Sequence, residues 1–181
     1  TDVVICPGSR NAPLSLALLA RDDIRVHTRI DERSAAFAAL GMARVTHRHV
    51  GVVTTSGSAV ANTWPAVVES RYSHTPLAII SADRPERLVG TGASQTIEQP
   101  GIFGAYATTT QVAAVGDEVD IDKRFAQDLT VHINVAFDAP LLGDGLPQQT
   151  GKRRQLPPVV TATQRAGVVD HGEVEVDLSR N

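Results

Sequence analysis

The segment Asp31-Glu32-Arg33-Ser34-Ala35-Ala36 joins the two patterns that decide the expected fold. Before it, residues 24–28 read Ile-Arg-Val-His-Thr, a short run rich in β-branched residues that is typical of a strand. After it, residues 34–45 contain five alanines and no proline, which is typical of a helix. A turn that leads from a strand into a helix lies at the edge where open α/β sheets bind ligands, so Glu32 is the first candidate functional residue.

The same alternation of short apolar runs and helical patterns extends along most of the chain. Further helical patterns cover residues 13–20 and 58–72. The alternation predicts an α/β fold of three layers, in which a parallel six-stranded sheet carries helices on both faces. The strand-like runs are residues 3–6, 24–28, 50–54, 77–81, 107–112 and 131–135.

Two connections depart from this regular pattern. Residues 83–99 carry Pro85, Gly90 and Gly92 among polar residues, which predicts a long irregular loop of the kind that often has a function. Residues 117–130 are barely long enough for a crossover, so we expect a short helix there or a shortened chain around residues 127–130.

We expect residues 1–142 to form one domain and residues 143–181 to be a linker that leads into a further domain. The second segment is rich in glycine and proline, and its Lys152-Arg153-Arg154 cluster suits a solvated surface better than an anion site. Its Gly143-Asp144-Gly145 triplet is interpreted as a turn, because Pro147 follows closely. The chain begins almost directly on a strand and without Met, which suggests that an N-terminal helix precedes it.

Composition argues against several classes of protein. The net charge of −3 gives no electrostatic basis for binding nucleic acid or an anionic membrane. No apolar run approaches the roughly 20 residues that a membrane-spanning helix needs. The single cysteine, Cys6, rules out a disulfide framework and is expected to be a buried thiol in a cytoplasmic protein. The six histidines show no metal-binding spacing, and His132 is expected in the core.

Two further strand-to-helix turns should meet Glu32 at the same sheet edge. In Pro7-Gly8-Ser9-Arg10-Asn11, free backbone N–H groups favour an anion and Arg10 offers two donors to a carboxylate, although a plain turn with a surface arginine fits as well. Thr55-Ser56-Gly57-Ser58 could hold a phosphate or approach a flat ring, but it lacks the P-loop lysine. Ser56 or Ser58 is also expected to cap the helix that follows.

The long loop adds another arginine and an amide. Arg84 is expected to point into the same crevice as Arg10, where two arginines suit a dicarboxylate or a carboxylated ring. A solvated salt-bridge cluster is the alternative, and Arg87 fits that description better than Arg84. Gln95 offers a neutral donor and acceptor, but the local sequence does not distinguish it from a residue that packs the loop.

Five motifs in this order closely resemble the N-terminal, pyrimidine-binding domain of the 2-succinyl-5-enolpyruvyl-6-hydroxy-3-cyclohexene-1-carboxylate synthase family of menaquinone biosynthesis. The resemblance covers residues 3–142. The motifs are Cys6-Pro7-Gly8-Ser9-Arg10-Asn11-Ala12-Pro13-Leu14, Asp31-Glu32-Arg33-Ser34-Ala35, Thr55-Ser56-Gly57-Ser58-Ala59-Val60-Ala61-Asn62, Ala82-Asp83-Arg84-Pro85 and Gly92-Ala93-Ser94-Gln95-Thr96-Ile97.

This resemblance implies an enzyme that uses thiamine diphosphate and a divalent metal, Mg²⁺ or Mn²⁺, to join 2-oxoglutarate to isochorismate with release of CO₂. Glu32 is implied to hydrogen-bond N1′ of the aminopyrimidine and to favour its imino tautomer. Pro7 and Thr55 match positions beside the pyrimidine ring. The positions that match the isochorismate pocket are Ser9, Arg10, Arg84 and Gln95, and Gln95 is also taken as catalytic.

The resemblance also implies a homodimer or homotetramer whose active site forms between domains of two subunits, with the metal held by a C-terminal domain outside this chain. The isolated chain is therefore expected to be inactive, with at best weak cofactor binding. Ser94 departs from the family's usual asparagine, and the usual Gly-Pro before Val131 is missing.

Two alternatives remain. One is another thiamine-diphosphate carboligase or decarboxylase, such as an acetolactate-synthase-like enzyme, which shares the helix-opening glutamate but lacks the arginines and Gln95. The other is a non-catalytic α/β interaction module, which would have no need of Glu32.

Overall fold

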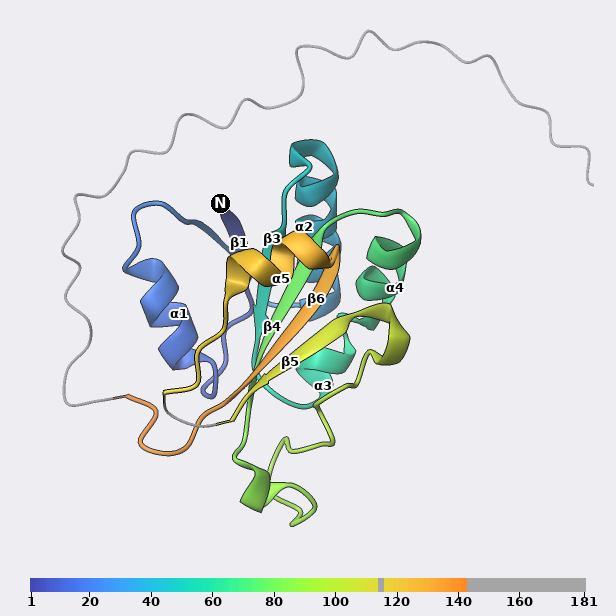
Figure 1. The fold of residues 1–181 in the computed structure, drawn as a ribbon. Helices are drawn as coiled ribbons and strands as arrows, with labels where there is room; N and C mark the ends of the chain where they lie inside the picture. Colours follow the sequence, from blue (N-terminus) through green and yellow to red (C-terminus); the bar gives the residue numbers. More distant parts are fainter. Residues whose placement is uncertain (114–115, 143–181) are drawn as a thin grey trace, which may run out of the picture. The chain divides into compact units, whose positions relative to one another are not determined.

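The computed structural model describes residues 1–113 and 116–142. They form a six-stranded sheet in the order β2-β1-β3-β4-β6-β5, in which every pair of neighbours is parallel (Figure 1). The predicted six-stranded parallel sheet is therefore confirmed, whereas the predictions for residues 143–181 lie outside the described residues. The strands are β1 Asp2–Ile5, β2 Arg25–Thr28, β3 Val50–Thr54, β4 Leu77–Asp83, β5 Thr108–Val112 and β6 Thr130–Ala136.

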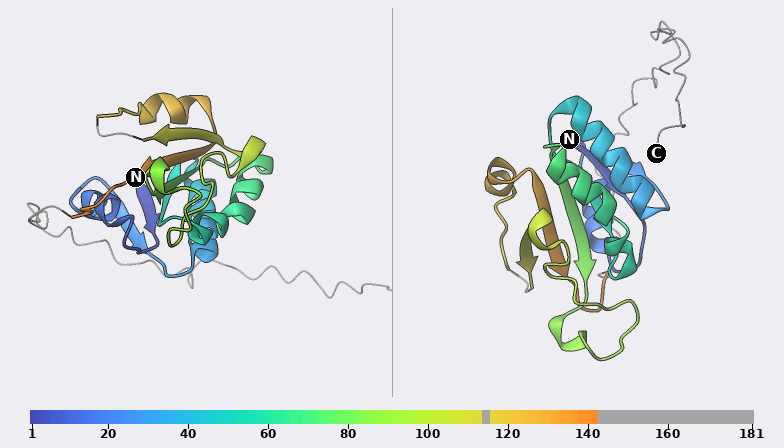
Figure 2. Two further views of the ribbon diagram at one scale, coloured as in Figure 1. Left: turned by 90° about the horizontal axis from the view of Figure 1, so that it is seen from below. Right: turned by 90° about the vertical axis from the view of Figure 1, so that its right-hand side faces the viewer.

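Helices pack on both faces of this sheet, which confirms the predicted three layers. Figure 2 shows α2 and α4 together on one face and α1 on the other. The long connection after β4 contains only two short 3₁₀ turns, so it is irregular as predicted. The helices are α1 Ala12–Leu19, α2 Glu32–Thr46, α3 Ser58–Ala61, α4 Trp64–Tyr72 and α5 Ile121–Gln127, and the 3₁₀ turns are Glu86–Leu88 and Gly104–Tyr106.

The central strands bury side chains on both faces, as expected for a parallel sheet covered by helices. On one face, Val4 and Ile79 pack against the helix side that contains Ala35, Ala36 and Ala39 of α2. Because alanine has only a methyl side chain, these residues let the helix approach the sheet closely.

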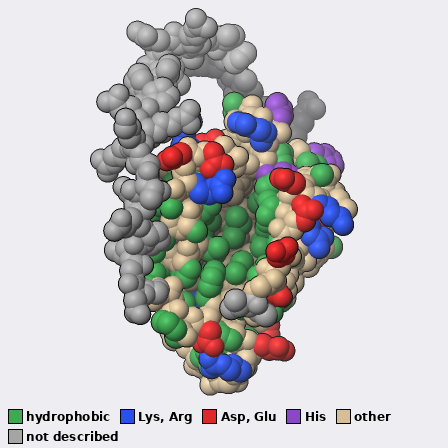
Figure 3. All heavy atoms as spheres, turned by 60° about the vertical axis from the view of Figure 1, so that its left-hand side comes forward, with side chains coloured by type: hydrophobic (Ala, Val, Ile, Leu, Met, Phe, Trp, Pro, Cys, Tyr) green, Lys and Arg blue, Asp and Glu red, His purple; other side chains and the backbone are tan. Residues whose placement is uncertain are grey.

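On the opposite face, Val3, Ile5 and Val53 form a second core with Leu14 and Leu18 of α1. Alternate residues of β1 thus serve opposite cores, which follows from the two-residue period of a strand. Figure 3, which brings the α1 side of Figure 1 forward, shows apolar side chains gathered in a hollow rimmed by charged ones.

The helix predicted over residues 58–72 is divided into α3 and α4, so that part of the prediction was wrong. Pro65 lies in the first turn of α4 and has no N–H to donate to the preceding turn of helix. The hydroxyl of Thr63 instead donates to Val60 O over 2.7 Å and closes the end of α3. Proline in a first helical turn is well tolerated, so the chain restarts a helix there.

Helix α2 begins two residues earlier than predicted because Asp31 caps it. The carboxylate of Asp31 accepts from the backbone N–H of Ser34 at 2.7 Å and stabilises the first turn, so the helix begins at Glu32. Crossover α5 is a short helix, as expected from the length of its segment. No helix within residues 1–113 and 116–142 combines the length and the apolar character that crossing a membrane requires.

Candidate active site

The order of the strands places a topological switch point between β1 and β3, and the space outside the carboxyl ends of these strands is termed the crevice. From β1 the chain passes through α1 to β2 on one side, and from β2 it passes through α2 to β3 on the other side. The two connections therefore leave the carboxyl end of the sheet in opposite directions. Open α/β sheets bind ligands at such a switch point. The turns after β1, β3 and β4 all end at this edge, because the strands are parallel and adjacent.

Glu32 lies beside this crevice as the first residue of α2, and its side chain is half-buried. A carboxylate at the start of a helix is stabilised by the helix dipole. Glu32 is close to Cys6 at the end of β1. Burial raises the pKa of the Cys6 thiol to about 12, and the negative charges of Glu32 and Asp31 raise it further. Cys6 is therefore a neutral, buried thiol, as expected.

The turns after β1 and β3 contact each other through Gly8 and Thr55. A Cβ atom added to Gly8 would lie 2.6 Å from Cβ of Thr55, closer than real side chains approach. Glycine is therefore required for the contact between these turns. Thr55 is buried at 9 % exposure, whereas the neighbouring Pro7 is exposed. Pro7 and Thr55 thus lie on adjacent turns at the crevice, and of the two only Thr55 is buried.

Arg10 and Arg84 converge from the turns after β1 and β4. Nη1 of Arg10 donates to the main-chain carbonyl of Phe137 at 2.8 Å, while Nη1 of Arg84 donates to Ser56 Oγ and, at 3.1 Å, to Gln95 O. Burial, followed by the positive charge of Arg10, lowers the pKa of Arg84, and Asp83 opposes this shift. The positive charges of the two guanidinium groups thus oppose each other, and an anion bound by both would relieve that repulsion.

Arg87 behaves differently from Arg84. It forms two contacts of 2.7 and 2.6 Å with the carboxylate of Asp138, and both side chains are more than half exposed. Such exposed pairs contribute only about 0–1 kcal/mol to stability. Arg87 is therefore the solvated ion-pair residue that the sequence favoured.

Gln95 is brought to the same edge by the loop after β4, but its backbone is unusual. Its φ of 58° lies in the left-handed region, which a residue with a Cβ adopts only at some cost. Its main-chain carbonyl accepts from Ser56 Oγ at 2.9 Å, and its side chain is exposed. Ser9 is also exposed at this edge, on the turn after β1.

The expected capping by Ser56 or Ser58 is not observed. The N-cap of α3 is Gly57, with φ of 76° and no side-chain hydrogen bond. The hydroxyl of Ser56 turns instead to the carbonyl of Gln95, and Ser58 is already the first residue of the helix. A turn that begins with glycine in this conformation leaves the serine hydroxyl free to hold the neighbouring loop.

A buried polar network beneath this edge was not predicted from the sequence. Gln99, Ser81 and Asn134 are fully buried and hydrogen-bonded to one another, with Nε2 of Gln99 at 2.6 Å from Oδ1 of Asn134. One signal was available: Thr130, His132 and Asn134 alternate as polar residues on one face of β6. Gln99 stands between a glutamate and a proline, and nothing in its local sequence marks it as buried.

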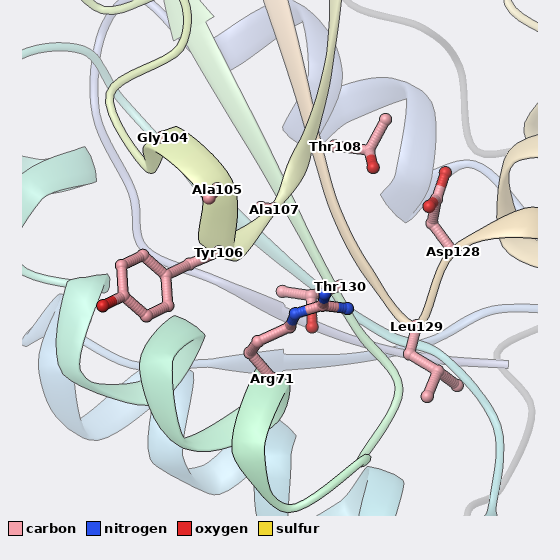
Figure 4. A pocket seen from close by; sticks show the side chains of 9 residues that line it. All are labelled: Arg71, Gly104, Ala105, Tyr106, Ala107, Thr108, Asp128, Leu129 and Thr130. Atoms are coloured by element: carbon pink, nitrogen blue, oxygen red, sulfur yellow. The ribbon is translucent and has the colours of Figure 1, made fainter.

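Nowhere in the described part of the chain do three His, Cys, Asp or Glu side chains gather closely enough to hold a metal ion. A cavity of about 260 Å³ lies at the opposite end of the sheet from the crevice (Figure 4). Its lining includes Arg71 and the first residues of β5 and β6, Thr108 and Thr130. It is therefore separate from the edge that carries Glu32 and the two arginines.

A carboxylate at the start of a helix, a glycine-dependent contact between turns and a pair of arginines at one switch point are consistent with a cofactor-dependent enzyme domain. Residues 1–102 match the family described as "Thiamine pyrophosphate enzyme, N-terminal TPP binding domain". The chain belongs to this family of thiamine pyrophosphate enzyme N-terminal domains.

The curated relatives make the membership more specific. The chain is 59 % identical to the 2-succinyl-5-enolpyruvyl-6-hydroxy-3-cyclohexene-1-carboxylate synthase of Corynebacterium diphtheriae, over 99 % of this chain and 33 % of the relative. It is 52 % identical to the synthase of the same name from Corynebacterium glutamicum, over 100 % of this chain and 33 % of the relative. The resemblance drawn from the motifs is thereby confirmed, and the chain spans about a third of the length of these relatives.

A solved structure supports the fold. Benzoylformate decarboxylase from Polynucleobacter necessarius superposes with a TM-score of 0.64 at 18 % sequence identity, covering 75 % of this chain and 27 % of that one. At this identity the similarity shows a shared architecture and carries no argument about substrate.

Proposed function

We propose that this chain is the pyrimidine-binding domain of a thiamine-diphosphate-dependent transferase. The complete enzyme would decarboxylate 2-oxoglutarate and add the resulting succinyl semialdehyde unit to isochorismate in menaquinone biosynthesis. The observation that carries the proposal is the placement of Glu32 at the same sheet edge as Arg10 and Arg84. The names of the relatives support it. Because the chain spans about a third of those relatives, activity is proposed for the full-length protein, and the isolated chain is expected to be inactive.

The residues at the crevice fit the aminopyrimidine ring of the cofactor. Glu32 supplies a half-buried carboxylate at the crevice, and the close contact of Gly8 with Thr55 keeps the neighbouring turn compact enough for a flat ring to approach. In this proposal Pro7 and Thr55 lie beside the ring. Bound thiamine diphosphate supplies the carbanion chemistry, and Glu32 shares a proton with its N1′ atom.

Arg10, Arg84, Ser9 and Gln95 are proposed to bind isochorismate. Both guanidinium groups now donate to main-chain carbonyl groups, which are weaker acceptors than a carboxylate. Each guanidinium uses only Nη1 for these contacts, so its other N–H groups remain for a carboxylate of a dicarboxylate. The side chains of Ser9 and Gln95, both exposed, can pair with hydroxyl groups of the substrate, and Gln95 is also proposed to act as a catalytic residue on the acceptor.

The remaining parts of the proposal concern the complete protein. Mg²⁺, or Mn²⁺ in its place, would be held by a C-terminal domain, with residues 1–142 as the pyrimidine-binding domain and residues 143–181 as the linker to the next. The complete enzyme is proposed to be a cytoplasmic homodimer or homotetramer.

The test is an assay of the full-length protein with 2-oxoglutarate, isochorismate, thiamine diphosphate and Mg²⁺. The Glu32→Gln variant replaces the carboxyl group that would share the proton by an amide of nearly the same shape. We expect this variant to lose activity by about 10²–10⁴-fold, the usual contribution of a general acid or base. Glu118→Gln changes an exposed glutamate before α5 and should leave the rate unchanged. An active Glu32→Gln enzyme would remove this residue from the mechanism. No product from a folded, cofactor-binding parent would point to another thiamine-diphosphate enzyme.

A further inference from the structure

Gln99 is an amide side chain with no exposed surface in the connection between β4 and β5. Both ends of its amide are satisfied. Oε1 accepts from the backbone N–H of Gly57 at 2.8 Å, and Nε2 donates to Asn134 Oδ1 at 2.6 Å, to Ala82 O at 3.0 Å and to Ser81 Oγ at 3.2 Å. A buried amide is costly unless its polar atoms are paired, so this environment suits an amide and disfavours an apolar side chain.

One end of this network leads to Arg84. Asn134 donates from Nδ2 to Asp83 Oδ2 at 2.7 Å, and the other oxygen of Asp83 accepts from the backbone N–H of Arg84 at 2.7 Å. Asp83 and Asn134 are almost fully buried, with 2 % and 0 % exposure. Through Asn134 and Asp83, Gln99 therefore helps to fix the backbone of Arg84, the first residue after β4.

The other end leads to Gln95. Gly57, whose N–H is held by Gln99, lies directly under the loop: a Cβ atom on Gly57 would be 3.0 Å from both Cγ and O of Gln95. The position of the Gly57 turn thus determines how far Gln95 extends over the crevice. Gln95 cannot settle into a relaxed backbone conformation by itself, because its φ of 58° must be maintained by its surroundings.

We propose that Gln99 is a positioning residue that fixes the spacing between Arg84 and Gln95 and so determines the affinity for the carboxylate-bearing acceptor. This inference rests on the proposed function, in which both residues bind isochorismate. Loss of the amide frees the buried N–H of Gly57, lets the turn and loop separate and moves Gln95 away from Arg84. The 2-oxoglutarate step, which depends on the cofactor side of the crevice, is not affected.

The test uses the full-length synthase and two variants. Gln99→Met keeps the length of the side chain and removes its hydrogen bonds, while Gln127→Met makes the same change at an exposed residue of α5. We expect KM for isochorismate to rise tenfold or more in Gln99→Met, with KM for 2-oxoglutarate within twofold of the parent. Gln127→Met should match the parent in both constants.

A purely structural role would instead lower the amount of active enzyme, so kcat would fall while both KM values stayed constant. That result, or an equal rise in both KM values, overturns the inference. If the unmodified synthase forms no product, the proposed function itself fails, which is a separate outcome. Hydrogen–deuterium exchange gives a readout without turnover: peptides containing Gly57 and Gln95 should exchange faster in Gln99→Met than in Gln127→Met, and equal rates also overturn the inference.

Ser81→Ala is a third variant, for use if Gln99→Met does not fold. It removes the contact of the Ser81 hydroxyl with Nε2 of Gln99 at 3.2 Å, together with its contacts with Asn134 Oδ1 at 2.7 Å and His132 Nε2 at 2.8 Å, and deletes only one atom from the core. We expect a rise of about threefold in KM for isochorismate, again without a change for 2-oxoglutarate, since about 0.6 kcal/mol corresponds to that ratio at 25 °C. Unchanged KM values for both substrates in a folded Ser81→Ala enzyme contradict the role assigned to Gln99.

Discussion

Nη1 of Arg84 donates to the main-chain carbonyl of Gln95 across 3.1 Å, so the residue that begins the loop after β4 holds a residue near the middle of that loop. Ser56 completes the contact, because its hydroxyl lies between the guanidinium of Arg84 and the same carbonyl. The arginine therefore has two roles at the crevice. It closes the loop through one nitrogen and leaves the rest of its guanidinium for an anion.

Arg84→Lys is expected to raise KM for isochorismate by tenfold or more. Lysine keeps the positive charge but cannot hold the carbonyl of Gln95 and a carboxylate with one planar group. A hydrogen bond to a charged group is worth about 1.5–3 kcal/mol, which corresponds to a factor of ten or more. Steady-state kinetics of the full-length enzyme measures the effect.

Arg87→Lys is the matched control for this change. Its ion pair with Asp138 is exposed and contributes little, so KM should stay within twofold of the parent value. Equal effects of the two substitutions would show that only general positive charge at this edge matters, and the role of Arg84 as a specific ligand would be wrong.

Two substitutions of Gln95 distinguish the role of its side chain in activity from the effect of its backbone conformation on stability. Its φ of 58° is strained for any residue with a Cβ, by about 1 kcal/mol, and glycine adopts it freely. Gln95→Gly and Gln95→Ala should therefore lose the addition to isochorismate equally, at least tenfold in kcat/KM. Urea unfolding of the same proteins should show Gln95→Ala about 1 kcal/mol less stable than Gln95→Gly. Equal stabilities would mean that the loop adjusts its backbone at this position.

The contact between the turns after β1 and β3 predicts that even a small side chain at Gly8 lowers the stability of the protein. Gly8→Ala would place a Cβ 2.6 Å from Cβ of Thr55, and overpacking of this kind costs about 1–3 kcal/mol. Gly41→Ala, in the middle of α2 with no atom outside the backbone of its own helix within 4 Å of the new methyl group, should stabilise the protein by about 0.5–1 kcal/mol. Urea unfolding, followed by the fluorescence of the single tryptophan, Trp64, compares the two.

A double variant identifies the clash as the cause. Gly8→Ala combined with Thr55→Gly removes the atoms that collide, so the pair should be more stable, by about 1 kcal/mol, than the sum of the two single losses. Additive losses would place the strain of Gly8→Ala elsewhere in the turn.

The positions of Glu32, Arg10 and Arg84 in the fold were predictable from the sequence, because each depends on a local sequence pattern. Glu32 begins α2 because Asp31 can cap the helix, and both the strand before it and the alanine-rich run after it are visible in the sequence. Arg10 and Arg84 follow strands that the period of apolar residues already placed in the sheet. For such residues, the alternation of strand and helix patterns was sufficient to bring them to one edge.

The parts that the sequence did not reveal depend on contacts between distant segments. Gln99 is buried because β4 and β6 are neighbours, and its partner Asn134 lies 35 residues away along the chain. The hydroxyl of Ser56 binds the loop at Gln95 because Gly57 takes the capping position. Neither choice is encoded in a local pattern. Both follow from the order of strands, which the alternation of strand and helix patterns leaves open.

His132 gives the chain a pH dependence whose sign is determined by burial. The side chain has no exposed surface and contacts Ser81 Oγ at 2.8 Å and Thr109 Oγ1 at 3.4 Å, with the edge of its ring near Phe103. Burial lowers its pKa from 6.5 to about 4. The unfolded chain therefore binds a proton first as the pH falls. The contribution of His132 to stability is complete above pH 6.5 and is lost between pH 6.5 and about 4.

The expected loss over that interval is about 3 kcal/mol at most, from 1.36 kcal/mol for each pKa unit. His132→Gln keeps a polar group for Ser81 and should reduce the pH dependence of the free energy of unfolding. Burial also lowers the pKa of His49, which contacts the carbonyls of Asp128 and Leu129, so His49→Gln should remove only its own share and retain that of His132. Urea unfolding at pH 7, 6, 5 and 4.5, followed by Trp64 fluorescence, measures each slope. If His132→Gln kept the slope of the unsubstituted chain, the acid sensitivity would have to come from His49 or from carboxylates instead.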